Sequence, residues 1–183
     1  MNNPPELVTA RLRLRALTEA DTEAIVALFA DPAMSAHFAV PLTDPSRVRA
    51  MVDRRLSYDG PAGMGHWVIE RDGEVIGLAH LRPSEELPGR VPEIGYYLSR
   101  AHGGKGLATE AAGALLAHGL TGLGLSSVWA LVGESNVASQ NLVRRLGFLD
   151  VGGGDHYGSG PHRVFVALPS EHGKPHHIAM PLS

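Results

Sequence analysis

The sequence contains no cysteine, and this absence excludes disulfide bonds, thiolate metal sites and cysteine nucleophiles. Long apolar runs are also missing: no window approaches the roughly 20 apolar residues that a membrane-spanning helix requires. The first residues, 1–14, mix proline and arginine with apolar residues and lack the hydrophobic stretch of a signal peptide. We therefore expect a cytoplasmic protein that has no membrane partner.

Neither sign of charge dominates, because 16 Lys and Arg stand against 19 Asp and Glu, for a formal net charge of −3. This balance gives no general reason to expect a nucleic-acid partner. A chain of 183 residues that is 44% hydrophobic can bury one ordinary core, and chains usually divide only beyond about 250–300 residues. We predict a single domain over residues 1–183, with its core at about 9–168 and a C-terminal tail at 169–183.

The tail contains three histidines, His172, His176 and His177. Glu171 is the only carboxylate near them at a spacing suited to metal ligation, so we expect no metal site there.

Apolar and polar residues alternate or recur in patterns that predict the order β-α-α-β-β-β-α-β-α-β-β. Asp44-Pro45 is typical of a helix start, with a cap followed by proline at the first helical position. Asp72-Gly73 indicates a hairpin turn. The predicted strands are 9–17, 66–70, 74–81, 93–98, 127–132, 148–151 and 164–168. Two helices are predicted to begin near Thr18 and Asp44, and two more are predicted over 107–123 and 137–146. This order favours one α/β domain with a mixed sheet.

The most informative segment is the glycine-rich loop before the long predicted helix, which reads His-Gly-Gly-Lys-Gly-Leu-Ala-Thr-Glu-Ala over residues 102–111. Small residues let successive backbone N–H groups point into one concavity, and the helix N-terminus adds positive potential behind them. A diphosphate suits such a site. The P-loop and the dinucleotide-binding fingerprint both fail on spacing, because Lys105 is followed by Gly106 and the third glycine position is occupied by Thr109.

The segment 103–108 resembles the pyrophosphate-binding motif of the GNAT superfamily of N-acetyltransferases, although Gly103 stands where Arg, Gln or Trp is usual. Residues 93–98 resemble the strand that meets the pantetheine arm of coenzyme A in that family. Residues 136–148 resemble the following helix. Residues 9–15 resemble the start of the Rim branch, the ribosomal-protein N-acetyltransferases and their relatives. The four motifs occur in the family's order.

The resemblance implies a GNAT-like α/β fold, in which about four helices flank a mixed, largely antiparallel central sheet with a V-shaped splay. Acetyl-CoA would lie in the V as co-substrate, and no metal would be needed. A backbone N–H near Tyr97 or Leu98 would polarise the acetyl carbonyl. The other expected cofactor-binding residues are Gly103, Gly104, Lys105, Gly106, Leu107, Ala108, Thr109, Asn136 and Arg145.

The resemblance also suggests the catalytic residues. Many members carry a tyrosine as proton donor where this chain has Val143, whereas the Rim branch carries a serine that Ser139 matches. Ser139 is thus the candidate donor to the leaving thiolate, and its alternative is an ordinary residue of the first helical turn. Asn136 has the alternative of a helix cap. Arg144 and Arg145 either contact the 3′-phosphate of coenzyme A or form part of a solvated helix face.

The candidate general base is Glu93, with Asp155 and His156 as second choices. Its alternative is a strand residue that pairs with an arginine. His37, Phe38 and Trp67 lie in segments expected to line the acceptor side, where they either shape substrate choice or pack.

The expected function is acetyl transfer to a primary amine, in particular a protein or peptide N-terminal α-amine, by direct attack in a ternary complex. Alternatives are a small-molecule acceptor (antibiotic, polyamine or amino acid) and a non-catalytic module that only binds acetyl-CoA. The expected oligomeric state is a monomer or a homodimer.

Overall fold

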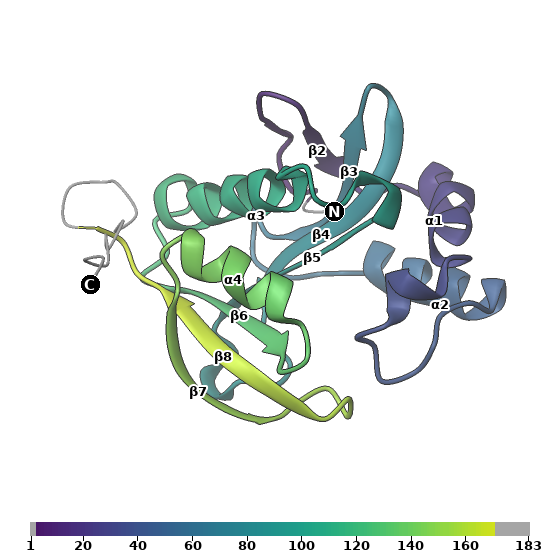
Figure 1. Ribbon diagram of the computed structural model, residues 1–183. Helices are drawn as coiled ribbons and strands as arrows, with labels where there is room; N and C mark the ends of the chain where they lie inside the picture. The colour runs from purple at the N-terminus through teal and green to yellow at the C-terminus, as the bar shows by residue number, and fades with distance from the viewer. Residues whose placement is uncertain (1–2, 171–183) are drawn as a thin grey trace.

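The computed structural model describes residues 3–170 and shows one eight-stranded sheet flanked by helices (Figure 1). The tail histidines therefore lie outside the described residues. The strands are β1 (Leu7–Val8), β2 (Arg13–Ala16), β3 (Gly65–Arg71), β4 (Glu74–Pro83), β5 (Pro92–Leu98), β6 (Val128–Gly133), β7 (Leu149–Asp155) and β8 (Pro161–Ala167). The α-helices are α1 (Thr22–Phe29), α2 (Pro45–Leu56), α3 (Leu107–Ala117) and α4 (Val137–Arg145).

The strands follow the order β1-β2-β3-β4-β5-β6-β8-β7 across the sheet. Every neighbouring pair is antiparallel except β5 and β6, which are parallel. The predicted mixed, largely antiparallel sheet is confirmed. Within residues 3–170, no helix combines the length and the apolar composition needed to cross a bilayer.

Each face of the sheet buries its own core, because successive strand residues point to opposite faces. On one face α3 and α4 pack over residues such as Ile94 and Leu81. On the other face α1 and α2 pack over Val68 and Leu78. In Figure 1, α1 and α2 lie together at the right of the view, and α3 and α4 lie together at its left and centre. The two faces thus offer different surroundings to the same strand.

Two local signals behave as predicted. The Asp44 side chain accepts a hydrogen bond from the Ser46 backbone N–H and caps α2, with Pro45 at the first helical position. Asp72 and Gly73 take positive φ angles of 52° and 81° and form the turn of the β3–β4 hairpin.

Several predicted boundaries were wrong. The strand expected over 9–17 covers only Arg13–Ala16 as β2, and a separate short strand, β1, precedes it at Leu7–Val8. The helix expected to reach residue 123 ends its α-helical part at Ala117 and continues as a π-helical turn, His118–Gly122. The His118 side chain is fixed there by a 2.8 Å hydrogen bond between its Nε2 and the Gly63 carbonyl. β7 extends through three glycines to Asp155, beyond the predicted end at 151, because it pairs with β8 along its length.

The sheet opens between β5 and β6. These strands pair at one position only, Glu93 with Trp129, and then separate toward the glycine-rich loop. The backbone edges that face each other beyond that position are therefore free to bind something else. This is the predicted V-shaped splay.

Candidate active site

A cavity of about 1000 Å³ occupies the splay and continues onto both faces of the sheet. Its walls come from β5, β6, the loop 102–106, the first turns of α3 and α4, and one side of α2. The cavity therefore joins segments that are distant in the sequence.

The glycine-rich loop presents a row of unused backbone donors. Gly104 and Gly106 have φ angles of 72° and 75°, a region that favours glycine, and this turns the chain into α3. Among residues 3–170 the structure gives no acceptor for the backbone N–H groups from Gly104 through Thr109. All of these residues except Lys105 line the cavity. Consecutive free donors at a helix N-terminus fit a diphosphate, so the loop suits coenzyme A.

Arg11 braces this loop from outside the cavity. Its guanidinium lies 2.7 Å from the Glu110 carboxylate and donates a 2.8 Å hydrogen bond to the Lys105 carbonyl oxygen. Thr9 donates to the other oxygen of Glu110. The Lys105 C=O and the Gly106 N–H belong to one trans peptide and therefore point in opposite directions. By binding the carbonyl oxygen, Arg11 thus fixes the direction of the Gly106 N–H.

Arg11→Ala is expected to raise the KM for acetyl-CoA about fivefold while leaving kcat within twofold. The side chain is partly exposed, so the loss is that of a positioning hydrogen bond, roughly 1 kcal/mol. Steady-state kinetics with varied acetyl-CoA measures it. Arg47→Ala, an exposed arginine of α2 away from the loop, is the control. An unchanged KM in Arg11→Ala would contradict the brace.

β5 also offers backbone donors to the splay. The Ser99 N–H donates to Ile76 on the β4 side. Since N–H groups alternate along a strand, the N–H groups of Tyr96 and Leu98 point toward β6, and that of Tyr97 points toward β4. Of the two alternatives for the carbonyl-polarising donor, the N–H of Leu98 faces the splay and that of Tyr97 does not, although both residues line the cavity.

Ser139 lies opposite a residue that sequence reasoning missed. The Tyr96 hydroxyl and Ser139 Oγ are 2.7 Å apart, and both residues line the cavity on the α3–α4 face. Burial raises the pKa of Tyr96 to about 12, so its phenol is protonated at neutral pH. The alternation of β5, which places Ile94, Tyr96 and Leu98 on one face, was the signal that could have found it.

Glu93 is buried, with 3% of its surface exposed, at the apex of the splay. One carboxylate oxygen accepts a 2.5 Å hydrogen bond from the Ser84 hydroxyl and the other a 2.6 Å bond from the Tyr157 hydroxyl. The alternative of an arginine partner is thus not what the structure shows. Burial and the Glu93 charge raise the pKa of Tyr157, which lines the cavity beside Glu93.

The α1–α2 face of the cavity is lined by basic and aromatic side chains, including Arg55, His66 and His80. The His80 ring lies directly over Gly95: a Cβ on that glycine would come within 2.2 Å of the ring. The β4–β5 register is regular through Gly95. The strand glycine therefore marks a close approach by a side chain, not a bulge.

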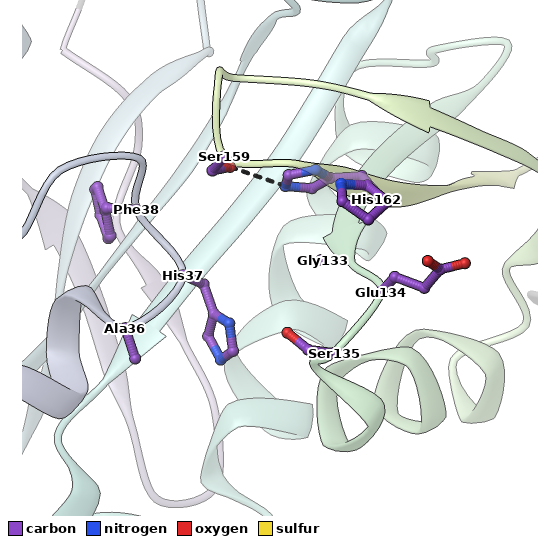
Figure 2. A pocket seen from close by; sticks show the side chains of 9 residues that line it. Ala36, His37, Phe38, Gly133, Glu134, Ser135, Ser159 and His162 are labelled. Carbon is purple, nitrogen blue, oxygen red and sulfur yellow. Dashed lines mark hydrogen bonds between the residues drawn. The ribbon is translucent and has the colours of Figure 1, made fainter.

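A smaller hollow of about 410 Å³ adjoins this cavity. Figure 2 shows His37 and Phe38 on one side of it and Glu134, Ser135 and His162 on the other. His37 and Phe38 line both spaces, as expected for the acceptor side. Trp67 does not: it is fully buried in the core, and its indole N–H donates to the Pro5 carbonyl.

The remaining predicted residues divide between the cavity and its surroundings. The Asn136 side chain accepts from the Ser139 N–H and caps α4, and Asn136 also lines the cavity, as does Arg145. Arg144 pairs with Asp150 at 3.1 Å and lies outside it. His156 lies 3.5 Å from Glu86. Neither Asp155 nor His156 lines the cavity; the neighbouring Tyr157 does.

The splay, the row of backbone N–H groups without acceptors and the Tyr96–Ser139 hydroxyl pair all border one cavity, and this combination suits a diphosphate-bearing acyl carrier. Residues 11–149 match the acetyltransferase (GNAT) domain family, and the chain belongs to that family. It is an acetyl-CoA-dependent N-acetyltransferase.

Relatives agree with this assignment. The chain is 34% identical over 145 residues to p20, an uncharacterized N-acetyltransferase of Bacillus licheniformis, covering 78% of this chain and 81% of the relative. It is 35% identical over 82 residues to spermidine N(1)-acetyltransferase of Escherichia coli K12, covering 45% and 44% of the two chains. A ribosomal L7/L12 α-N-protein acetyltransferase, RimL, solved with coenzyme A, shares the fold with a TM-score of 0.71 at 17% identity, covering 91% and 97%.

Proposed function

We propose that this enzyme acetylates the α-amine of a peptide or protein N-terminus. The acceptor side of the cavity supports this, because it holds few carboxylates: Glu93 is buried and hydrogen-bonded, Glu85 is paired with Arg82 at 3.2 Å, and one more, Glu134, lines the adjoining hollow. A polyamine or an aminoglycoside would need an acidic surface to gather its charges. An α-amine needs none.

The amine's own pKa supports the same acceptor. An α-amine with a pKa near 8 is roughly one-tenth neutral at pH 7, whereas a lysine-like amine near 10.4 is neutral only about once in 2,500. A site with one buried, hydrogen-bonded carboxylate therefore suits the α-amine better.

Acetyl-CoA supplies an activated acetyl thioester when bound. The free N–H groups from Gly104 through Thr109 would hold its diphosphate, and Arg145 at the cavity edge could meet a further phosphate. The Leu98 N–H faces the splay as the donor for a carbonyl oxygen. The Tyr96–Ser139 pair stands ready to donate a proton to a thiolate as it leaves.

Glu93 would accept the amine proton through Tyr157. The Tyr157 hydroxyl donates to Glu93 and lines the cavity, so it can pass its proton to Glu93 as it takes one from the acceptor side. Tyr157 has a positive φ of 56°, uncommon for a residue with a side chain. Its position is thus held against a local preference, as functional residues often are.

Glu93→Gln and Tyr157→Phe are each expected to lower kcat/KM for a peptide α-amine about tenfold at pH 7, less than the roughly 100-fold or more typical of general-base catalysis, because about one-tenth of the α-amine is already neutral. Raising the pH to 9 should recover most of the loss, because the amine is then neutral without help. The pH–rate profiles of both variants measure this. A wild-type profile in Glu93→Gln would remove Glu93 from the mechanism.

The proposed function is tested by thiol release from acetyl-CoA across N-terminal peptides, polyamines and aminoglycosides, with mass spectrometry of the products. We expect transfer to the peptide α-amine at the highest kcat/KM. Spermidine or an aminoglycoside as the best acceptor would overturn the peptide assignment while leaving the enzyme class intact. A cytoplasmic location and a monomeric or homodimeric state stay predictions.

A further inference from the structure

Arg55 carries a charge that nothing in the described protein neutralises. It is half-buried on α2, lines the cavity, and its guanidinium carbon lies 5.9 Å over the Tyr97 ring. Within residues 3–170 the structure gives this side chain no hydrogen bond and no ion pair. Arg15 shows the contrast, since its guanidinium lies 2.6 Å from Asp21 and 2.8 Å from Glu70.

The surroundings of Arg55 disfavour its positive charge. Burial lowers the pKa of Arg55, and the charges of Arg82 and Arg54 lower it further, while Tyr97 acts in the opposite direction. Arginine nevertheless stays protonated in proteins. A guanidinium partly withdrawn from water without a counter-ion is destabilised, and an anion in the cavity would offset that effect.

Arg82 extends the same wall. Its side chain is 13% exposed, and its partner Glu85 is 71% exposed at the rim. Burial, together with the charges of Arg55 and Arg82, lowers the pKa of His66 to about 3, and the same influences hold the pKa of His80 well below its usual range. Both histidines are therefore neutral at pH 7 and offer hydrogen bonds, not charge.

Three buried polar atoms on this wall have no partner in the described protein: the Tyr58 hydroxyl, His66 Nδ1 and His80 Nε2. All three residues line the cavity, and His80 is only 5% exposed. Buried polar atoms are normally paired, and a ligand with acceptor oxygens would supply the missing partners once small side-chain rotations expose these atoms to the cavity.

Resting on the proposed function, we propose that this wall, formed by Arg55, Arg82, Tyr58, His66 and His80, binds a carboxylate of the acceptor. The planar fork of a guanidinium matches a carboxylate with two parallel hydrogen bonds. In a peptide, the carboxylate would be an acidic side chain within the first residues after the attacked amine. In a free amino acid it would be the α-carboxylate.

The test compares peptides that differ only in an acidic residue and its amide: Asp against Asn, and Glu against Gln, at the second and third positions. We expect kcat/KM of the wild type to favour the acidic peptide about 10- to 100-fold, which corresponds to a charged hydrogen bond. Arg55→Met, which keeps an apolar side chain for packing on Tyr97, should reduce the preference to within threefold. The preference is a ratio of two kcat/KM values measured on the same variant, so any general loss of activity in Arg55→Met cancels.

Arg47→Met is the matched control, because Arg47 is an exposed arginine on the same helix that does not line the cavity. It should keep the full preference. Arg55→Lys should keep part of it. Arg55→Met should also melt no lower than the wild type, since it removes an unpaired charge, whereas a merely structural Arg55 would lower Tm and leave the preference unchanged.

Calorimetric titration of the same peptides, in the presence of coenzyme A, separates this proposal from the proposed function. Tighter binding of the acidic peptide without acetylation would support the subsite and contradict the proposed function. Acetylation with no preference for the acidic peptide would support the proposed function and contradict the subsite. Faster acetylation of a free amino acid than of any peptide would keep the subsite and assign it to the α-carboxylate. Spermidine as the best acceptor would overturn the proposal.

Discussion

Tyr96→Phe is expected to lower kcat for acetyl transfer about 100-fold, the lower end of what a positioned proton donor contributes. The phenol lies 2.7 Å from Ser139 Oγ, and burial keeps it protonated by raising its pKa to about 12. The raised pKa also sets the sign of the pH dependence: the donor stays intact as pH rises through the assay range and is lost only near 12. No basic limb from Tyr96 should appear at pH 7–10.

Ser139→Ala should lower kcat to a similar extent, and the double variant should be scarcely worse than either single one, because residues that act as a unit are non-additive. Single-turnover measurements of acetyl transfer isolate the chemical step from product release. Asn141→Ala, at an exposed position of the same helix, is the control and should retain kcat. A kcat within threefold of wild type in both single variants would show that neither hydroxyl donates the proton.

Gly106→Val is expected to weaken the binding of coenzyme A at least tenfold. Gly106 sits at φ 75°, where a residue with a Cβ costs roughly 1–2 kcal/mol and a β-branched one costs more. Relief of that strain would turn the adjacent peptides and misdirect the donors that begin α3. Calorimetric titration with coenzyme A measures the loss, and a melting curve verifies that the fold is retained.

The informative comparison is Lys105→Ala. This side chain does not line the cavity, and among residues 3–170 its ammonium has one polar contact, at 3.5 Å from the Ala101 carbonyl oxygen. If the loop binds phosphate through its backbone, removal of this cation should change coenzyme A affinity by less than threefold. A larger loss in Lys105→Ala than in Gly106→Val would mean that side-chain charge, not backbone geometry, holds the diphosphate.

The sequence predicted most of the fold because its local signals agree with the tertiary structure. The Asp44-Pro45 cap and the Asp72-Gly73 turn need only neighbouring residues to form, and both are confirmed. The three glycines of β7 carry no strand propensity, and pairing with β8 alone makes them a strand. No local pattern could reveal that pairing.

The candidate site was predictable where it depends on the backbone and less so where it depends on side chains that meet across the sheet. The glycine-rich loop was predicted because glycines at fixed spacing are visible in the sequence, and the structure places Gly103, Gly104 and Gly106 on the cavity wall. Tyr96 was missed because its partner, Ser139, lies 43 residues away on α4. The carboxylate-binding wall was hidden for the same reason: Arg55, His66 and Arg82 come from three different elements.

The single pairing between β5 and β6 has a thermodynamic consequence. It divides the sheet into two leaves, β1–β5 and β6–β8, whose facing edges meet only at Glu93 and Trp129. A co-substrate and an acceptor would share one cavity with walls on both leaves, so each would bind against edges that the other also contacts. The two binding free energies are then linked. By reciprocity, if the bound acceptor raises the affinity for acetyl-CoA by some factor, bound acetyl-CoA raises the affinity for the acceptor by the same factor.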